Sequence, residues 1–448
     1  MRGIPSRRRL VRLTGAAILA AALAALGATG AFARDRGHSG GNDHGHKGGH
    51  DHGSKPVLGA VYTETNDAAG NAVLVFARHR DGTIVQTASV PTGGVGLAKN
   101  PPFDFPIVDS QAAVALSEDG RLLFAVNAGD NTVTVFGVTK HGLRKVDRVA
   151  SGGTEPISVT SNGNVVYVLN SHSGNIAGFK LTRHDRLRPI AGSSQSLSTP
   201  GPGSIAAQIG FSPNGRVLTV SERCYLGGCA NQPKGVLDTF VVDRHGRAGA
   251  AQEHSSDDYG PFGFAYLNSK KLLVSNTGNI NHAPNPPDPA DPTLFTGTTS
   301  SYTLDRFGNV TPNGGPVASG GRGACWIVIT GNHKYAFVTN SLSTFPPGTG
   351  TGGVARYAVA PNGTLTLIGQ TDDSPSTPPG ASFPTDLTLS QDSRYLYVLS
   401  PTLGMLPAPN DNNTSHIDVY RVGRDGSLTH IQATPATLPS GTSGMAAS

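Results

Sequence analysis

The chain has 448 residues and a formal charge of +5, from 35 Lys and Arg against 30 Asp and Glu. The whole excess lies in residues 1–33, which contain five arginines and no acidic residue, so residues 34–448 are neutral. A neutral protein lacks the overall basic charge typical of nucleic-acid-binding proteins, and no nucleic-acid partner is expected. With 59 Gly, 32 Pro and 37% hydrophobic residues, the composition excludes a disordered or helical chain and favours an all-β protein with many turns.

Residues 1–33 have the organisation of an export signal. An arginine cluster precedes an apolar stretch from Leu13 to Leu26, and Ala31-Phe32-Ala33 forms an A-x-A cleavage site. The segment from Ser6 to Arg12 also fits the twin-arginine pattern, so the general and twin-arginine routes both stay open. No other apolar run is long enough to span a bilayer. The rest of the chain is therefore expected to be secreted, extracellular or in the cell envelope of a bacterium, with no transmembrane segment.

Residues 34–56 form a Gly- and His-rich segment without aliphatic or aromatic side chains. Such a segment cannot bury apolar surface and is expected to be disordered. Neutral imidazoles at this density can bind Zn, Ni or Cu weakly, and the alternative is a solvated spacer. The possible ligands are His38, His44, His46, His50 and His52. No required cofactor is expected.

The three cysteines suit an exported protein. Cys224 and Cys229 enclose four residues, which permits a local disulfide in an oxidising compartment. Cys325 is left over in an apolar segment, where a buried and unreactive thiol is expected.

From residue 57 to 448 a unit of four short strands repeats seven times. Its clearest part is a second strand that ends near Asn or Ser: 59–64, 122–127, 165–170, 217–222, 271–276, 335–340 and 395–400. An inner strand accompanies each of them: 112–117, 156–161, 206–212, 262–268, 325–330, 384–390 and 443–448. This repeat predicts a seven-bladed β-propeller of four-stranded antiparallel blades.

The two ends of the repeat region are out of step by one strand. The first repeat enters at a second strand, 59–64, whereas 443–448 resembles an inner strand without a blade of its own. We therefore expect the C-terminal strand to complete the first blade and close the ring, which removes the free edges of an open array.

The connections divide into two kinds. Tight turns with Asp or Asn before Gly, such as 117–121 and 212–216, belong on one face. Long connections share the other face: Glu222–Lys234, Thr277–Gly297, Ser341–Gly352, Pro401–Ser415, Thr92–Asp109 and Thr371–Ser382. Long loops on a rigid scaffold commonly carry binding sites, so we predict a ligand site on this loop-rich face, over the central channel.

The repeat units, with FSPNGRVLTVSE and LSQDSRYLYVLS as the clearest examples, resemble the lactonase family of seven-bladed propellers over about residues 57–448. That family includes 6-phosphogluconolactonase and carboxymuconate cyclase-like proteins. The resemblance implies hydrolysis of a cyclic ester, in which a carboxylate or His activates water and a cation stabilises the oxyanion. The strands also resemble surface-layer propellers, which leaves a non-catalytic extracellular binding or scaffold role as the alternative.

The residues typical of sugar-phosphate lactonases are only partly present. An Asp-Ile-His motif aligns with Asp386-Leu387-Thr388, and an Arg-His motif aligns with Cys325-Trp326 or, alternatively, with Ala207-Gln208. Pro401 stands where an Arg is common. The resemblance therefore implies an unphosphorylated lactone if the protein is a lactone hydrolase.

Five charged residues are the candidates for such a site. Asp386 is the candidate base and Arg322 the candidate oxyanion binder, with Glu155, Glu222 and Arg223 as candidate substrate-binding residues. The alternative is that each of them hydrogen bonds to the turns between blades. The expected partner is a small-molecule lactone or another extracellular ligand, and the protein is expected to be a monomer.

Overall fold

The computed structural model describes residues 56–97, 108–199, 205–224, 229, 232–279, 296–342, 352–372, 384–402, 414–439 and 441–448. The export signal and the five clustered histidines lie outside these residues, so their assignments stay predictions. Within the described part of the chain, no helix has the length and apolar character needed to cross a membrane.

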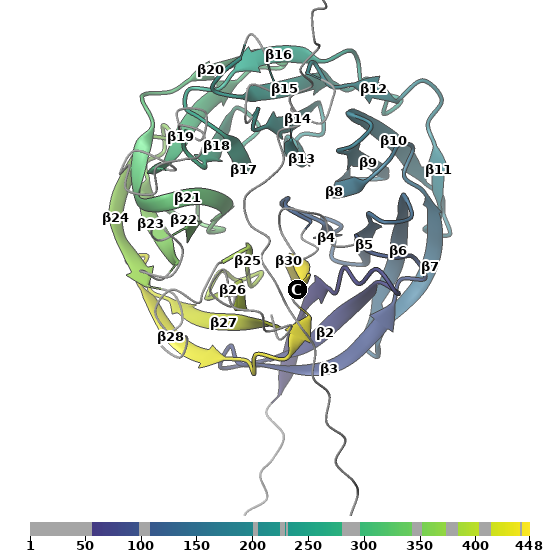
Figure 1. The fold of residues 1–448 in the computed structure, drawn as a ribbon, viewed down its shortest axis with the longest axis vertical. Coiled ribbons are helices and arrows are strands. Elements are labelled where there is room, and N and C mark those ends of the chain that lie inside the picture. The colour runs from purple at the N-terminus through teal and green to yellow at the C-terminus, as the bar shows by residue number, and fades with distance from the viewer. Residues whose placement is uncertain are drawn as a thin grey trace, which may run out of the picture. The chain divides into compact units, whose positions relative to one another are not determined.

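All regular structure in the described residues is β-strand, arranged in seven blades around an axis (Figure 1). Blades one to three contain β1 (Val57–Glu64), β2 (Ala72–His79), β3 (Ile84–Pro91); β4 (Val114–Leu116), β5 (Leu122–Asn127), β6 (Thr132–Thr139), β7 (Gly142–Ala150); β8 (Pro156–Asn162), β9 (Val165–Asn170), β10 (Asn175–Leu181), β11 (Leu187–Pro189) and the short β12 (Gln195–Ser196). Blades four and five contain β13 (Ala206–Phe211), β14 (Val217–Glu222), β15 (Val236–Val241), β16 (Gln252–Ser255); β17 (Pro261–Asn268), β18 (Lys271–Asn276), β19 (Thr296–Leu304) and β20 (Val310–Pro312). Blades six and seven contain β21 (Val317–Ile329), β22 (Tyr335–Leu342), β23 (Gly353–Val359), β24 (Leu365–Asp372); β25 (Asp386–Leu389), β26 (Tyr395–Thr402), β27 (Thr414–Val422), β28 (Leu428–Ala433), β29 (Leu438–Pro439), and β30 (Ser443–Ala447) returns to blade one.

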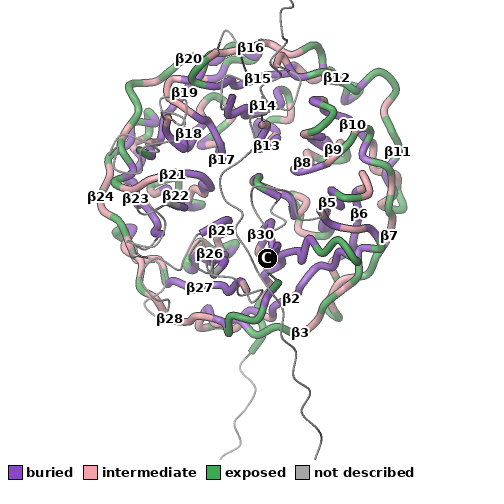
Figure 2. The backbone as a smooth tube through the Cα atoms, in the orientation of Figure 1, coloured by how far each residue is buried: buried purple, intermediate pink, exposed green. Residues whose placement is uncertain are grey.

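The burial of each strand follows its place in a blade. The second strands β5 and β14 are buried along their whole length, because a neighbouring blade packs on each face of the sheet. The outermost strand β3 instead exposes most of its residues. Buried residues accordingly follow the inner strands and exposed ones the perimeter (Figure 2). The predicted seven-bladed propeller is confirmed.

Ring closure by the C-terminal strand is also confirmed. β30 pairs antiparallel with β1 through Val61 opposite Ala447 and Tyr62 opposite Ala446. Met445 and Ala446 are buried against the neighbouring strands, so the last strand contributes to the core as well as to the sheet.

Blades five and six differ from the expected separation into independent sheets. β21 is 13 residues long and pairs with β19 in blade five and with β22 in blade six, which joins the two blades into one continuous sheet. The connection is rich in glycine, and Gly320 and Gly323 have positive φ values of 75° and 63°. Glycine adopts such positive φ values without steric cost, so these residues let the backbone turn from one blade to the next.

Successive strands run in opposite directions. The inner turns, between the first and second strands of a blade, and the outer turns, between its third and fourth strands, therefore lie on one face, called here the short-turn face. Contacts between neighbouring blades agree with this, since Tyr335 Oη at the start of a second strand donates to the carbonyl of Arg424 in an outer turn at 3.1 Å. The starts of the inner strands lie at the opposite, loop-rich face.

Candidate functional site

Residues Val108–Ala112, called here the strap, lie across the axis of the ring at its loop-rich end. Gln111 exchanges two hydrogen bonds with the backbone of Ile327 in blade six: its Nε2 donates to the carbonyl at 2.8 Å and its Oε1 accepts from the amide at 3.1 Å. The backbone amide of Gln111 donates to Ala207 in blade four, and Ser158 Oγ of blade three donates to its carbonyl at 2.7 Å. One residue of the strap thus connects the inner strands of three blades.

The neighbouring residues fix the strap further. Trp326 Nε1 donates to the carbonyl of Ser110 at 2.8 Å, and the Trp326 ring packs edge-on against Phe262 with centroids 4.7 Å apart. Ala112 has a φ of 67°, a conformation that L residues rarely adopt. Such a conformation persists only where the surrounding contacts hold it, so the position of the strap is well defined.

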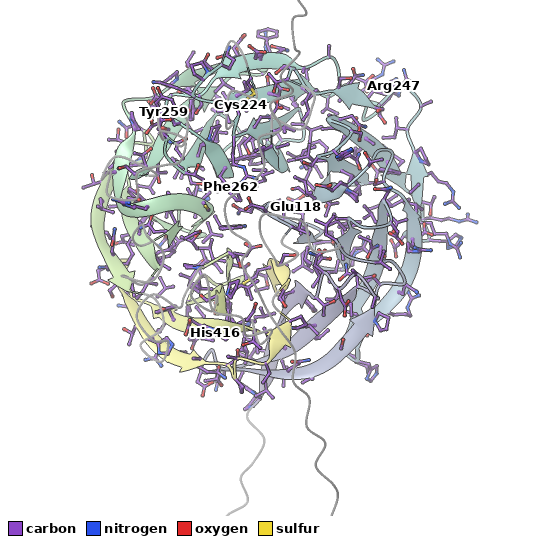
Figure 3. All side chains as sticks on the ribbon, in the orientation of Figure 1. Glu118, Cys224, Arg247, Tyr259, Phe262 and His416 are labelled. Carbon is purple, nitrogen blue, oxygen red and sulfur yellow. A yellow bond between two sulfur atoms is a disulfide. The ribbon has the colours of Figure 1, made fainter. Side chains whose placement is uncertain are left out.

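Arg223 and Asp109 meet where the strap reaches blade four. Nη1 of the buried Arg223 donates to Oδ2 of Asp109 and forms an ion pair with it, while its Nε donates to the carbonyl of Ile205 at 3.2 Å. The guanidinium lies 4.8 Å from the ring centroid of Phe262, which Figure 3 labels near the centre of the ring. The side chain of Asp109 is 50% exposed. A fixed cation is therefore joined to a carboxylate that water can reach.

The chain beyond Arg223 is anchored by the expected disulfide. Cys224 and Cys229 are bonded to each other, with their Cα atoms 5.1 Å apart. Both pack with Val236 in a small buried cluster. The crosslink holds the backbone directly after Arg223 against the start of β15.

Cys325 lies near the same ion pair but does not provide a nucleophile. The thiol is buried, and burial raises its pKa to about 12. The charge of Asp109 also raises this pKa, and that of Arg223 lowers it. The expectation of a buried cysteine is confirmed, and a raised pKa disfavours the reactive thiolate.

Asp386, the candidate base from the sequence, lies at the seam between blades seven and one. Its Oδ1 accepts from the amide of Leu387 at 2.7 Å, and the backbone of Met445 in β30 also hydrogen bonds to this carboxyl. Oδ2 has no hydrogen-bond partner among the described residues. Burial raises the pKa of Asp386 well above its ordinary value. The contacts of this carboxyl with Leu387 and Met445 join blade seven to the strand that closes the ring.

Replacement of Asp386 by Asn should change how the stability depends on pH. A carboxyl whose pKa is raised by folding contributes fully below its unfolded pKa of about 3.9, and this contribution is lost as pH rises through the folded-state pKa. Asn keeps the Oδ1 acceptor and cannot ionise, so Asp386→Asn should exceed the parent in free energy of unfolding by at least about 1 kcal/mol at pH 8. Urea unfolding at pH 4.5, 6 and 8 measures the difference, and a gap that does not widen with pH contradicts the assignment.

Glu222 occupies a position that repeats from blade to blade. It accepts a hydrogen bond from Thr199 Oγ1 at 2.6 Å and shares another with the carboxyl of Asp238 in the adjacent strand. Both carboxyl groups are fully buried, and burial raises the pKa of Asp238. In blades two and five the same positions hold Asn127 with Thr134 and Asn276 with Ser300, which are also hydrogen bonded. The contacts of Glu222 thus follow a structural pattern of the repeat, and its role in substrate binding stays a prediction.

Glu155 and Arg322 stand apart from the Arg223–Asp109 pair. Glu155 has a φ of 59° in the turn before β8, burial raises its pKa, and His172 lowers it. Arg322 is half-buried in β21, opposite Thr296, and its Nη1 has no hydrogen-bond partner among the described residues. Of the five candidates, the structure brings only Arg223 together with an acid that reaches solvent. That acid, Asp109, escaped sequence analysis because 114 residues separate the two in the chain.

A second polar cluster lies in blade seven, which sequence analysis also missed. His416 Nε2 and His430 Nε2 lie 3.0 and 2.9 Å from the two carboxylate oxygens of Asp418. Asp418 is fully buried and His416 nearly so. The cluster connects β27 to β28, and the side chain of His430 is partly exposed. Among the described residues, no group of three His, Cys, Asp or Glu is arranged to hold a metal.

Two cavities are found on the short-turn face rather than on the loop-rich face. One, of about 430 Å³, lies between blades six and seven and is lined by Asn332, Arg394 and Arg424. The other, of about 720 Å³, lies between blades two and three and is lined by Arg121 and Arg183. They therefore do not coincide with the predicted ligand site, much of whose loop structure falls outside the described residues.

Comparison with known proteins points to one family. Residues 69–206, from the end of the first connection to the start of blade four, match the model of the family described as lactonase, seven-bladed β-propeller. No curated protein sequence shows significant similarity to the chain.

Solved structures share the fold. A candidate 6-phosphogluconolactonase from Bacteroides fragilis is 16% identical with a TM-score of 0.59, over 87% of this chain and 98% of that one. Another, from Bacteroides uniformis, is 20% identical with a TM-score of 0.58, over 86% and 99%. A protein from Lactobacillus plantarum is 15% identical with a TM-score of 0.59, over 87% and 99%. The chain thus shares the seven-bladed fold of these structures, and residues 69–206 are similar to the lactonase family.

Proposed function

We propose that this protein hydrolyses a lactone at the loop-rich end of the axis, with Arg223 and Asp109 as the reacting pair. The observation that carries the proposal is the convergence of a buried guanidinium and a half-exposed carboxylate beside the strap. Hydrolysis of a cyclic ester needs a base for the attacking water and a cation at the developing oxyanion. This pair supplies both groups within one contact.

The reaction uses only water and the lactone. Oδ1 of Asp109, on the side chain that reaches solvent, takes a proton from water as its oxygen attacks the ring carbonyl. Arg223 stabilises the oxyanion that forms. When the intermediate collapses, the ring C–O bond breaks, the carbonyl re-forms, and the leaving alkoxide takes the proton from Asp109. The product is the open hydroxy acid.

The substrate class follows from the charge near the pair. Arg223 is partly neutralised by Asp109 and is the only cation in direct contact with it among the described residues. A phosphate group carries nearly two negative charges and commonly requires several cationic or amide donors. An unphosphorylated sugar, aromatic or acyl-homoserine lactone therefore suits the pair better. We further propose that the protein acts outside the cytoplasm, as the sequence of residues 1–33 predicts.

The test is a pH-stat assay of the purified protein against sugar, aromatic and acyl-homoserine lactones. The proposal expects base consumption above the spontaneous rate for at least one class, and no turnover across the whole panel contradicts it. The second candidate, a non-catalytic binding propeller, is favoured by one observation: Asp109 and Arg223 already satisfy each other. Binding of the same lactones by calorimetry without turnover would support that alternative.

A further inference from the structure

The short-turn face carries a repeated pattern of positive charge that the lactonase proposal does not use. In six of the seven outer turns, the second residue of the turn is a cation exposed to solvent. These residues, called here the outer ring, are Arg80, Lys140, Arg183, Arg244, Arg306 and Arg424. In blade six the position is Pro361. A single cation in a turn is ordinary, but its recurrence around the ring builds a circle of charge.

A second circle lies closer to the axis. In five of the six inner turns the residue before the second strand is an exposed cation. These residues, called here the inner ring, are Arg121, Arg216, Lys270, Lys334 and Arg394. Figure 3 shows that the inner turns lie closer to the axis than the outer turns: Glu118 of an inner turn is labelled near the centre and Arg247 of an outer turn at the rim.

The acidic residues of these turns are occupied by their own backbone. Asp243 Oδ1 accepts from the amides of His245 and Arg247 at 2.8 and 2.9 Å, and Asp305 Oδ1 accepts from those of Phe307 and Asn309 at 2.8 and 3.0 Å. Asp119 and Asp392 pair with inner-ring arginines. No outer-ring cation has an ion pair among the residues that the structure describes.

The face is therefore basic although the protein is neutral. Its thirteen turns contain thirteen Lys and Arg against eight Asp and Glu, so the turns have a net charge of +5. Because residues 34–448 sum to zero, the remainder carries a compensating −5. A protein with no net charge but with positive charge gathered on one face is oriented by an anionic surface. That surface attracts the basic face even though the protein as a whole is not attracted at long distance.

The backbone that presents the outer ring is held rigidly. Tyr395 Oη donates to the carbonyl of Arg80 at 3.0 Å, and Tyr335 Oη donates to that of Arg424 at 3.1 Å. Each tyrosine comes from the neighbouring blade, so the turns are fixed relative to one another. A rigid array loses little entropy when it binds.

We infer that the short-turn face binds the surface of a bilayer containing anionic phospholipid. Two concentric rings spread over a whole face match a planar array of charge, whereas a linear polyanion would contact only one sector of them. Of the two cavities of this face, the one between blades two and three is lined by three acids, Glu118, Asp119 and Asp185, beside its two arginines. The one between blades six and seven is lined by Arg394 and Arg424 against a single acid, Asp392. Paired guanidinium groups suit the phosphate of a lipid headgroup. Docking in this way leaves the Arg223–Asp109 pair on the side facing away from the bilayer.

The test is sedimentation of residues 54–448, which form one compact unit and hold every described strand, with vesicles. We expect binding to vesicles of equal phosphatidylglycerol and phosphatidylcholine at 50 mM NaCl, and its loss at 500 mM because salt screens exposed charges. The triple variant Arg183→Gln, Arg244→Gln, Arg306→Gln should bind about 10- to 100-fold more weakly, since each surface cation contributes about 1 kcal/mol. Circular dichroism checks that the variants are folded.

The matched control removes three exposed cations outside both rings, by Lys145→Gln, Arg148→Gln and Lys234→Gln. It should bind within about twofold of the parent, since salt screening limits charge effects to about 10 Å. Equal loss in both triple variants, no binding to phosphatidylglycerol vesicles, or binding to soluble polyphosphate but not to vesicles would each overturn the inference. These outcomes do not depend on lactone hydrolysis.

Discussion

Arg223→Gln should lower kcat/KM for the lactone that the panel identifies by about 10²- to 10³-fold, the range found when a donor to an oxyanion is removed. Asp109→Asn should lower kcat by at least about 10²-fold, as the loss of a general base does. The double variant should be no slower than the slower single one, because the two residues act as one unit. Arg223→Lys should keep part of the activity, since a charge remains without the planar group that lies over Phe262.

The controls are Arg322→Gln and Asp386→Asn, the pair that sequence analysis placed at the reacting centre. Arg322 is also an arginine at the loop-rich end, half-buried where Arg223 is buried, and has no contact to Asp109 among the described residues. If Arg322→Gln loses activity and Arg223→Gln keeps it, the active site lies in blade six and the Arg223–Asp109 assignment is refuted. Thermal unfolding of each variant separates a loss of chemistry from a loss of fold.

Removal of residues 443–448 should have the largest effect on stability. Without β30, the edge of β1 is exposed and Met445 and Ala446 no longer cover Val61 and Tyr62. Loss of the Met445 side chain alone costs about 2–5 kcal/mol, so the free energy of unfolding should fall by at least about 3 kcal/mol. The open edge should also make the truncated protein associate with itself, which analytical ultracentrifugation measures.

A peptide of residues 441–448 added to the truncated protein provides the control. The peptide should raise the melting temperature and restore the monomer, whereas the same peptide with Met445→Glu should not. In the full chain, Met445→Leu should cost less than about 1.5 kcal/mol because it conserves volume. A truncated protein that melts like the parent would show that ring closure contributes little to stability.

Much of the fold could be read from local pattern. The second strands were located correctly because a strand buried on both faces must be continuously apolar, as in 122–127 and 395–400. Asp or Asn before Gly marked the tight turns for an equally local reason, the need for a positive φ. Ring closure followed from one further observation, that 443–448 had no blade of its own. The joining of blades five and six through β21 was not predictable, because it depends on a pairing partner in another blade.

The candidate site was predicted less well, because its residues meet only through tertiary packing. Arg223 was selected for its place after a second strand, but Asp109 lies in the strap, more than two blades away in sequence. Asp386 looked available from sequence, and the structure places it in the interface with β30, where burial raises its pKa. Charge type is visible in a sequence, but burial and pairing are not.

The number of blades, the order of their strands and the neutrality of residues 34–448 can all be read from the amino-acid sequence. The distribution of the charges over the surface depends on the folded chain. Because alternate strands run in opposite directions, turns far apart in the chain come to one face and bring their cations into two rings. The same alternation brings the starts of the inner strands and the strap together at the other face, where Arg223 meets Asp109. Composition adds charges over the chain, whereas folding sorts them by position, and interactions at the surface depend on that position.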